Sequence, residues 1–384
     1  MTREPGPDGY KPENIAATER GGPTPGMNVN RISTIAEFDA ERERWERLEQ
    51  LDPQSTVFTS WRWLRAYLPV ARHRWLILVL REGSEAVAYL PLGHGGSLLD
   101  RELFLAGNSV ADYAGMVTLP SRADAAVNAF ADTLIGEKWD AFNVLDVDDS
   151  RIEALVRRLV ERGVRIETTD ETRCLWCELP PTWEQYIAER ISSKTRVNTL
   201  RVERRLAETL PGFRASEPTD DDIDEHVEAM IEVNHKRWGG NLQSARRRFG
   251  TLFRNAYRQG VLRMFVYWDG AKPIAGGAVF TDDARSSFGL YMLGFDEAYD
   301  KLSPGKGIVG RAIRAAIEGG FARFDFLRGE EPFKARYADQ VHLTRHYRLT
   351  RPGLRAAAIA RARPKLRALK LAVANIVYGP GRSL

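Results

Sequence analysis

Runs and alternations of hydrophobic residues divide this chain into short strands and amphipathic helices. The run 75–80 (WLILVL) is typical of a buried strand, and the turn at 81–83 leads into a second apolar segment, 86–92. This spacing predicts a β-hairpin. Further strands are predicted in the first half at 103–106, 116–119 and 140–147, and helices at 36–51, 122–135 and 151–162.

The second half of the chain repeats this plan. Strands predicted at 262–268 and 273–281, joined by Asp269-Gly270, match the first hairpin, and the segment FNVL (142–145) aligns with FDFL (324–327). We therefore predict an α+β fold built from two copies of one unit, each a mixed, mostly antiparallel sheet flanked by helices. The alternative is that the matches are the partial ones that any α+β chain gives. Other elements expected here are helices at 220–238, 244–259 and 304–319, and strands at 287–295, 322–327 and 342–350.

The ends of the chain differ from this periodic body. Residues 1–30 are rich in Gly, Pro, Asn and Thr, which predicts a disordered leader. The repeat then gives a first half at 31–180 and a second half at 181–351. A tail, 352–384, reads as helical, with Leu and Val residues on one side and Lys and Arg flanking them.

Charge is distributed unevenly along the 384 residues. The formal net charge is +4, but ten of the 56 Lys and Arg residues and none of the 52 Asp and Glu residues lie in 345–384. The rest of the chain is therefore mildly acidic, which argues against a nucleic-acid-binding protein. No segment has the apolar length of a membrane span, and none resembles a signal peptide, so we expect a cytoplasmic protein. The tail fits either a helix packed on the acidic body or a peripheral contact with the inner membrane face.

Metal and redox chemistry are not expected. Cys174 and Cys177 form the CxxC sequence of the strand-like segment CLWCEL, where a strand directs their side chains to opposite faces. The histidines are scattered, and no pair has the spacing of metal ligands. We therefore predict no metal.

The sharpest local motif is LSPGKG (302–307), between a predicted strand and a predicted helix. Ser303 can cap the helix, and Pro304 suits its first turn. Gly305 and Gly307 remove side chains from the free N–H groups of the helix start, and Lys306 adds positive charge. The motif predicts a phosphate site, with an ordinary capped helix as the alternative.

The order of strand, glycine-containing helix start and following strand resembles the Gcn5-related N-acetyltransferase (GNAT) family. In that family this segment binds the pyrophosphate of acetyl-CoA, and the two strands splay to admit the pantetheine. Leu302 stands where the family usually has Gln or Arg.

A closer resemblance, over most of 35–345, is to the CelD-type acetyltransferases of bacterial polysaccharide biosynthesis, a double GNAT group related to the Fem peptidyltransferases. The segments that carry it are FTSWRWL (58–64), YLPL (89–92), DYAG (112–115), the basic segment 191–206, SPG (303–305), FDFLRG (324–329) and Phe333-Lys334. The resemblance implies tandem GNAT-like halves, with the acyl-CoA site in the second.

The resemblance also implies the function. We expect an acyl-CoA-dependent N-acyltransferase, with acetyl-CoA or another acyl-CoA as donor and an amino sugar of envelope or extracellular polysaccharide as acceptor. The first alternative is a Fem-like transferase using aminoacyl-tRNA, with the basic segment 191–206 on the RNA; a solvated helix face is the default for that segment. The second is a degenerate transferase acting as a non-enzymatic assembly factor.

Acyl transfer to an amine needs a proton acceptor and donors for the oxyanion, but no covalent nucleophile. Asp325, Asp112 and Glu330 are the carboxylates that the motifs place best for the proton. Each also has a structural interpretation as an ion-pair, turn or surface residue. Tyr113, His235, Trp238 and Lys334 are the residues expected to contact the substrate.

Overall fold

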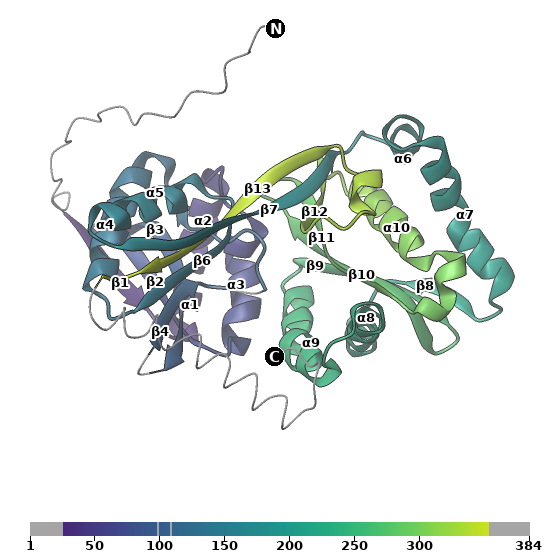
Figure 1. The fold of residues 1–384 in the computed structure, drawn as a ribbon, viewed down its shortest axis with the longest axis horizontal. Helices are drawn as coiled ribbons and strands as arrows, with labels where there is room; N and C mark the ends of the chain where they lie inside the picture. Colours follow the sequence, from purple (N-terminus) through teal and green to yellow (C-terminus); the bar gives the residue numbers. More distant parts are fainter. Residues whose placement is uncertain (1–25, 98–99, 108–109, 353–384) are drawn as a thin grey trace, which may run out of the picture.

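The computed structural model describes residues 26–97, 100–107 and 110–352, which form two α/β lobes joined by a long strand pair (Figure 1). The expected tail and nearly all of the expected leader lie outside these residues. In chain order the first lobe contains β1 (Met27–Ile32), α1 (Ile35–Ala40), α2 (Arg42–Leu51), η1 (Val57–Thr59), α3 (Trp61–Tyr67), η2 (Leu68–Val70), β2 (Arg74–Glu82), β3 (Glu85–Ser97), β4 (Asp100–Leu105), β5 (Val117–Thr118), η3 (Pro120–Arg122), α4 (Ala123–Gly136), β6 (Ala141–Val147), α5 (Ser150–Glu161) and β7 (Arg165–Glu178).

The second lobe follows the same order of elements after an added helical segment. Its elements are α6 (Trp183–Gln185), η4 (Tyr186–Arg190), α7 (Ser193–Thr209), β8 (Phe213–Ser216), α8 (Ile223–Trp238), α9 (Leu242–Arg258), β9 (Leu262–Asp269), β10 (Lys272–Asp282), β11 (Ser287–Phe295), η5 (Glu297–Leu302), α10 (Pro304–Glu318), β12 (Arg323–Arg328), η6 (Lys334–Arg336) and β13 (Gln340–Thr350).

The two lobes share one continuous sheet. In the described residues its strand order is β1-β2-β3-β4-β6-β13-β7-β12-β11-β10-β9-β8, with β5 paired to β3. The predicted repeat is visible in the register, because β4 and β6 pair in parallel at Leu103 and Phe142, as β11 and β12 do at Phe288 and Phe324. The α+β class and the mixed, mostly antiparallel sheet are confirmed.

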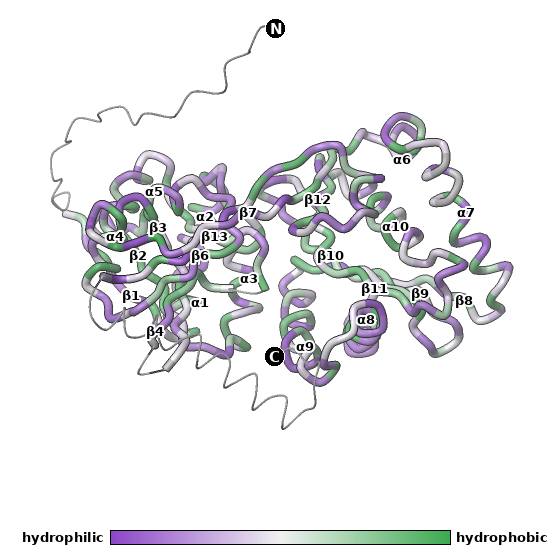
Figure 2. The backbone as a smooth tube through the Cα atoms, viewed as in Figure 1, coloured by the Kyte–Doolittle hydropathy of each residue, from purple (hydrophilic) through white to green (hydrophobic). Residues whose placement is uncertain are grey.

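The last strand of each lobe comes from the other half of the chain. Strand β13 pairs with β6 of the first lobe, and β7 pairs with β12 of the second. The two strands also pair with each other from Gln340 opposite Trp176 to Thr350 opposite Arg165, which forms the bridge between the lobes. Figure 2 shows long hydrophilic stretches along β7, whereas β9, β10 and β11 are mostly hydrophobic. The buried side chains of β7, Cys174 and Cys177, lie at the end that pairs with β12.

Helices cover both faces of the sheet in each lobe, and one hydrophobic core spans the junction. Helices α4 and α5 pack on one face of the first sheet, and α7 and α10 on one face of the second. Helices α1, α2, α3, α8 and α9 contribute to a shared core between the lobes. Phe58 of the predicted aromatic segment lies in this core, with its ring 5.5 Å from that of Phe280 and 6.4 Å from that of Tyr291.

Two predicted elements differ from the structure. The helix expected at 36–51 is broken at Glu41, whose buried side chain accepts a hydrogen bond from the Tyr89 hydroxyl (2.7 Å), so the chain turns inward there. Strand β1 begins inside the expected leader, since Met27 pairs with Glu82 at the edge of the sheet. An edge strand with few buried side chains leaves too weak a pattern to be recognised.

Candidate active site

A cleft opens in the second lobe where β11 and β12 separate. The two strands pair in parallel over only three residues, ending at Gly289 opposite Asp325. Leu327 adopts φ 54°, and its N–H donates to the Asp325 carboxylate (2.7 Å), which turns the end of β12 away from its neighbour. The cleft between the separated ends has a volume of about 310 Å³.

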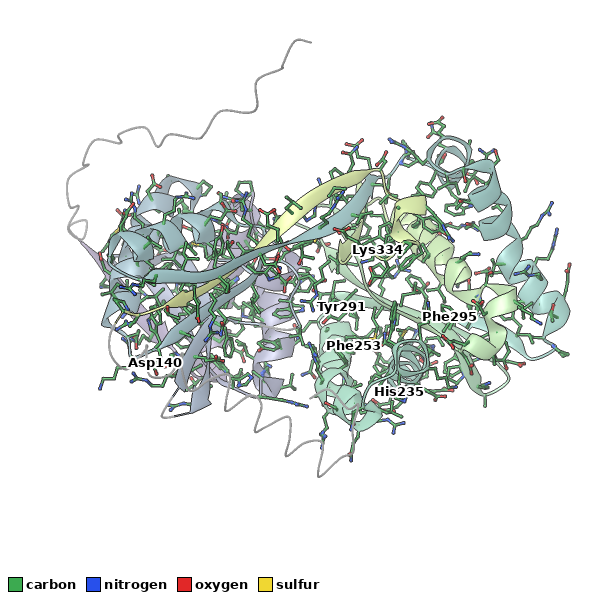
Figure 3. All side chains as sticks on the ribbon, viewed as in Figure 1. Asp140, His235, Phe253, Tyr291, Phe295 and Lys334 are labelled. Atoms are coloured by element: carbon green, nitrogen blue, oxygen red, sulfur yellow. The ribbon has the colours of Figure 1, made fainter. Side chains whose placement is uncertain are left out.

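The floor of this cleft contains a β-bulge in β11. On β10, Ala278 pairs with Met292 and Val279 with Leu290, so Tyr291 is the extra residue. A bulged residue leaves backbone groups outside the ladder, where they can hydrogen-bond a ligand. The Tyr291 side chain points toward the first lobe beside Phe253 (Figure 3), and its hydroxyl donates to the Val110 carbonyl (3.0 Å). The hydroxyl is therefore engaged in joining the lobes.

Asp112 is the predicted carboxylate that lines the cleft. It is buried, and its Oδ1 lies 3.1 Å from Nε of Arg328, which also lines the cleft. Burial raises the pKa of Asp112 to about 6, the Arg328 charge opposes this rise, and the Asp146 charge adds to it. A carboxyl group with this pKa is mostly ionised at neutral pH and can accept a proton.

Asp146 and His346 form a second layer behind Arg328. Asp146 lies 2.8 Å from Nη1 of Arg328, and burial raises the pKa of Asp146. His346 contributes its Nε2, which is 2.9 Å from the Thr172 hydroxyl and 3.7 Å from the Asp146 carboxylate. Because Asp112 and Asp146 share one guanidinium group, the protonation of either affects the other.

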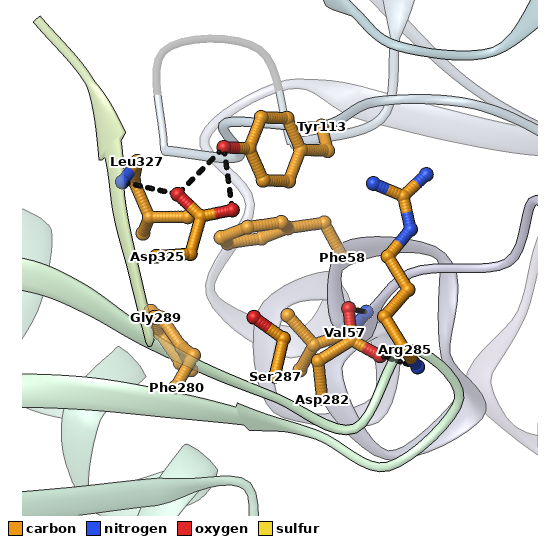
Figure 4. A pocket seen from close by; sticks show the side chains of 10 residues that line it. All are labelled: Val57, Phe58, Tyr113, Phe280, Asp282, Arg285, Ser287, Gly289, Asp325 and Leu327. Atoms are coloured by element: carbon orange, nitrogen blue, oxygen red, sulfur yellow. Dashed lines mark hydrogen bonds between the residues drawn. The ribbon is translucent and has the colours of Figure 1, made fainter. Parts of the chain in front are cut away.

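Asp325 does not line this cleft. It is buried beneath Leu327, and both of its oxygens lie 3.0 Å from the Tyr113 hydroxyl, which donates to it (Figure 4). Burial raises the pKa of Asp325 to about 6 and holds that of Tyr113 well above its usual value. The two residues border a separate cavity of about 10 Å³, room for roughly one water molecule. This location suits a link between the lobes better than direct contact with a substrate.

The other residues expected from the FDFLRG motif lie in the loop after β12. Glu330 points to the surface, where it pairs with Arg173 (3.4 Å). Lys334 is buried, and its ammonium group donates to the carbonyls of Arg328 (2.7 Å) and Gly329 (3.2 Å) and pairs with Glu331 (2.7 Å). Lys334 therefore holds the loop that carries Arg328, and Glu331, not Glu330, borders the cleft.

Helix α8 brings Trp238 to the cleft but directs His235 elsewhere. The Trp238 indole N–H donates to the Leu293 carbonyl on β11 (3.0 Å). His235 has its Nδ1 3.2 Å from the Gly239 carbonyl (labelled in Figure 3). Asn234, four residues before Trp238 and on the same helix face, lines the cleft instead. That spacing was the signal in the sequence that would have indicated Asn234.

The start of α10 differs from the predicted cap. Ser303 adopts φ 55° and ψ 46°, and its side chain makes no capping hydrogen bond; it accepts one from Lys306 Nζ (3.3 Å) instead. Pro304 occupies the first turn, as predicted. A Cβ on Gly307 would lie 2.7 Å from Val202 and 2.8 Å from Tyr267, so close packing accounts for this glycine. Gly305 lies at the second helical position, where helix geometry leaves the N–H free for an anion.

Three polar residues that line the cleft were not recognised from the sequence: Arg248 on α9, Asn234 on α8 and Glu331 after β12. Across the described ranges, no three His, Cys, Asp or Glu side chains gather as a metal site. In the same ranges, every helix is too short or too polar to cross a bilayer. Cys174 and Cys177 are free thiols in different hydrophobic clusters, and burial raises the pKa of each to about 12.

Comparison with known proteins agrees with the fold. Residues 193–335 match the family described as acetyltransferase (GNAT) domain, which supports an acyltransferase. The structure resembles that of FemX, with a TM-score of 0.56, 10% identity, and coverage of 83% of this chain and 96% of that one. It also resembles a tandem GNAT protein from the clavulanic acid biosynthesis pathway (TM-score 0.48, 11% identity, 85% and 100% coverage). A third similar structure is the C-terminal domain of a putative lysylphosphatidylglycerol synthetase from Agrobacterium fabrum (TM-score 0.48, 12% identity, 90% and 100% coverage). The sequence has no significant match among curated proteins.

Proposed function

We propose that this protein transfers an acyl group from acyl-CoA, with acetyl-CoA as the first candidate, to an amino group of a sugar or related polysaccharide precursor. The observation that carries the proposal is the separation of β11 and β12 into a cleft lined by the buried carboxylate Asp112. The match of residues 193–335 to the GNAT domain agrees with it. The amino-sugar acceptor rests on the CelD-type resemblance of the sequence.

The donor would lie between the separated strands, with its phosphates at the start of α10. Gly305 would supply a backbone N–H there, and Lys306 a positive charge. The backbone N–H groups around the bulge at Tyr291 would stabilise the oxyanion that forms as the amine attacks the thioester carbonyl.

Proton transfer would pass through Asp112. The attacking nitrogen forms the C–N bond, the C–S bond breaks, and CoA leaves as a thiolate that takes a proton from solvent. The proton lost by the nitrogen passes to Asp112, directly or through a water molecule. Arg328 keeps this carboxylate ionised near neutral pH, and Asp325 positions Arg328 by holding the backbone turn at Leu327.

Acyl-CoA binding tests this proposal directly. Calorimetric titration with acetyl-CoA should show binding to the full chain, and Lys306→Gln should weaken it. Lys301→Gln, a neighbouring lysine outside α10, is the matched control. The absence of acyl-CoA binding, together with salt-dependent binding of aminoacyl-tRNA, would favour the Fem-like alternative. Unchanged biological function of Asp112→Asn would favour the assembly-factor alternative.

A further inference from the structure

A second hollow between the lobes lies beside the far end of α9. Helices α3 and α9 face each other across the junction (Figure 1), and the cavity beside them has a volume of about 640 Å³. Its lining comes from both halves of the chain and includes Asp39, Arg42, Trp61, Arg65, Asn255 and Arg258. The proposed acyl transfer uses none of these residues.

The lining of this hollow is cationic. Three guanidinium groups line it: Arg65 pairs with Asp39 (2.7 Å), Arg42 pairs with Glu46 (3.1 Å), and the third belongs to Arg258. Arg42 lies over the Trp61 ring, 4.6 Å from its centroid, which holds the guanidinium group in place. Arg258 is exposed and forms no ion pair with any residue that the structure describes. The two carboxylates that pair with Arg65 and Arg42 therefore leave one unbalanced positive charge at the hollow, that of Arg258.

One face of α9 connects this hollow to the cleft. Arg248, Thr251, Asn255 and Arg258 are spaced by three, four and three residues, which places them on a single helix face. Arg248 lines the cleft, whereas Asn255 and Arg258 line the hollow. Ten residues of α-helix separate the two arginines by about 15 Å along the axis. Leu252, Phe253 and Ala256 of the same helix are buried in the shared core.

We propose that the hollow is a subsite for a negatively charged group of the acceptor, which lies along this face of α9 with its amine in the cleft. The inference rests on the proposed function, and it narrows the acceptor to a molecule with a phosphate or carboxylate about 15 Å from the amino group. Guanidinium groups bind both anions through paired hydrogen bonds. A phosphorylated sugar and an acidic saccharide therefore share the chemistry that this subsite recognises.

Direct binding of two small anions to the full chain tests the subsite without any turnover. Inorganic pyrophosphate represents the phosphate source and trigalacturonate the carboxylate source, each titrated calorimetrically at low salt. Arg65→Gln and Arg258→Gln should each weaken binding of the recognised probe about tenfold. Arg246→Gln is the matched control, because Arg246 lies on another face of α9 and pairs with Glu228 (2.7 Å). It should leave binding unchanged.

The outcomes separate this inference from the proposed function. Binding of one probe only identifies the source of the charge. If neither probe binds, the subsite is wrong. It is also wrong if Arg65→Gln and Arg258→Gln bind the probes as tightly as the unaltered chain does. That second result is expected if pyrophosphate binds only at the start of α10. Anion binding that depends on these arginines in a chain that binds no acyl-CoA would retain the subsite and overturn the proposed donor.

Discussion

At the residue scale, the site depends on one guanidinium group between two buried carboxylates. Arg328 contacts both Asp112 and Asp146, and these contacts join strand ends from the two lobes. The sequence indicated Asp112 by its motif but could not show that Asp146 would face the same cation, because the two lie 34 positions apart on different elements. The pKa of Asp112 is therefore set by a neighbour that only the fold reveals.

The pH dependence of acyl transfer should report this arrangement. Because burial raises the pKa of Asp112 to about 6, kcat/KM should rise with pH through a limb near pH 6. Asp146→Asn removes a negative neighbour and should move the limb to lower pH. Arg328→Met removes the positive neighbour and should move it to higher pH. Asp112→Asn should abolish the limb and reduce kcat by about 10²-fold or more.

Opposite shifts in the two variants are the decisive feature of that experiment. A general loss of structure would lower the rate in both without moving the limb in opposite directions. A limb at the same pH in the unaltered chain and in Asp146→Asn would show that Asp112 is not the group that titrates. Circular dichroism of each variant over the same pH range provides the control for folding.

Trp238 should compete with the donor for β11. Its indole N–H donates a hydrogen bond to the Leu293 carbonyl, which lies on the edge of β11 along which the donor would bind. Trp238→Phe keeps an aromatic ring but removes this hydrogen bond, so acetyl-CoA should bind about twofold to tenfold more tightly. Calorimetric titration measures the change, with Trp75→Phe, on β2 of the first lobe, as control. Weaker binding to Trp238→Phe would instead make the indole part of the donor site.

At the scale of elements, the sequence predicted those whose pattern is set locally. Strand β11 has the predicted bounds, and α10 differs from its prediction by one residue, because apolar periodicity and Pro304 mark them clearly. The polar edge strand β1 and the break at Glu41 were missed, because both depend on tertiary contacts. The close packing of Val202 and Tyr267 around Gly307 was missed for the same reason. A glycine gives the same signal in the sequence whether the space of its absent Cβ is taken by a phosphate or by side chains of neighbouring elements.

Packing against Gly307 gives a prediction for stability. A methyl group there would enter the space of Val202 and Tyr267, so Gly307→Ala should lower the free energy of unfolding by about 1–3 kcal/mol. Urea denaturation measures this loss. Gly136→Ala, at the last position of α4 where a Cβ meets nothing within 4 Å, should be neutral or slightly stabilising. If Gly307→Ala is as stable as the unaltered chain, packing does not require this glycine, and phosphate binding is the better explanation for it.

At the scale of the whole molecule, the exchange of β7 and β13 makes the two halves of the sequence interdependent. The repeat could be recognised from the sequence, but the exchange could not, because a strand such as β13 has the same pattern of side chains whichever lobe it completes. The boundary expected at 180–181 leaves β7 in the first half although it pairs with β12 of the second lobe. It leaves β13 in the second half although it pairs with β6 of the first lobe. We therefore expect this boundary to mark a limit of the repeat along the chain and not a limit of an independent folding unit.

Dividing the chain at that boundary should leave neither piece cooperatively folded. Residues 26–180 lack β13, which removes the buried Leu349 and one of the two strands that pair with β6. Residues 181–352 lack β7 and expose the edge of β12 beside the cleft. Unfolding followed by circular dichroism should show one cooperative transition for the full chain, none for either piece alone, and its return when the pieces are mixed.

A rearranged first half distinguishes strand exchange from general instability. Residues 26–164 joined through a flexible linker to 340–352 contain the strand order β1-β2-β3-β4-β6-β13 and should regain a cooperative transition. Residues 26–180 are the comparison, because they end in β7, the strand that follows in the sequence, and lack β13, the strand that pairs with β6. If 26–180 folds as cooperatively as the rearranged piece, β7 can replace β13, and the lobes are separable after all. If only the rearranged piece folds, the cleft at β12 depends on a strand supplied by the first half.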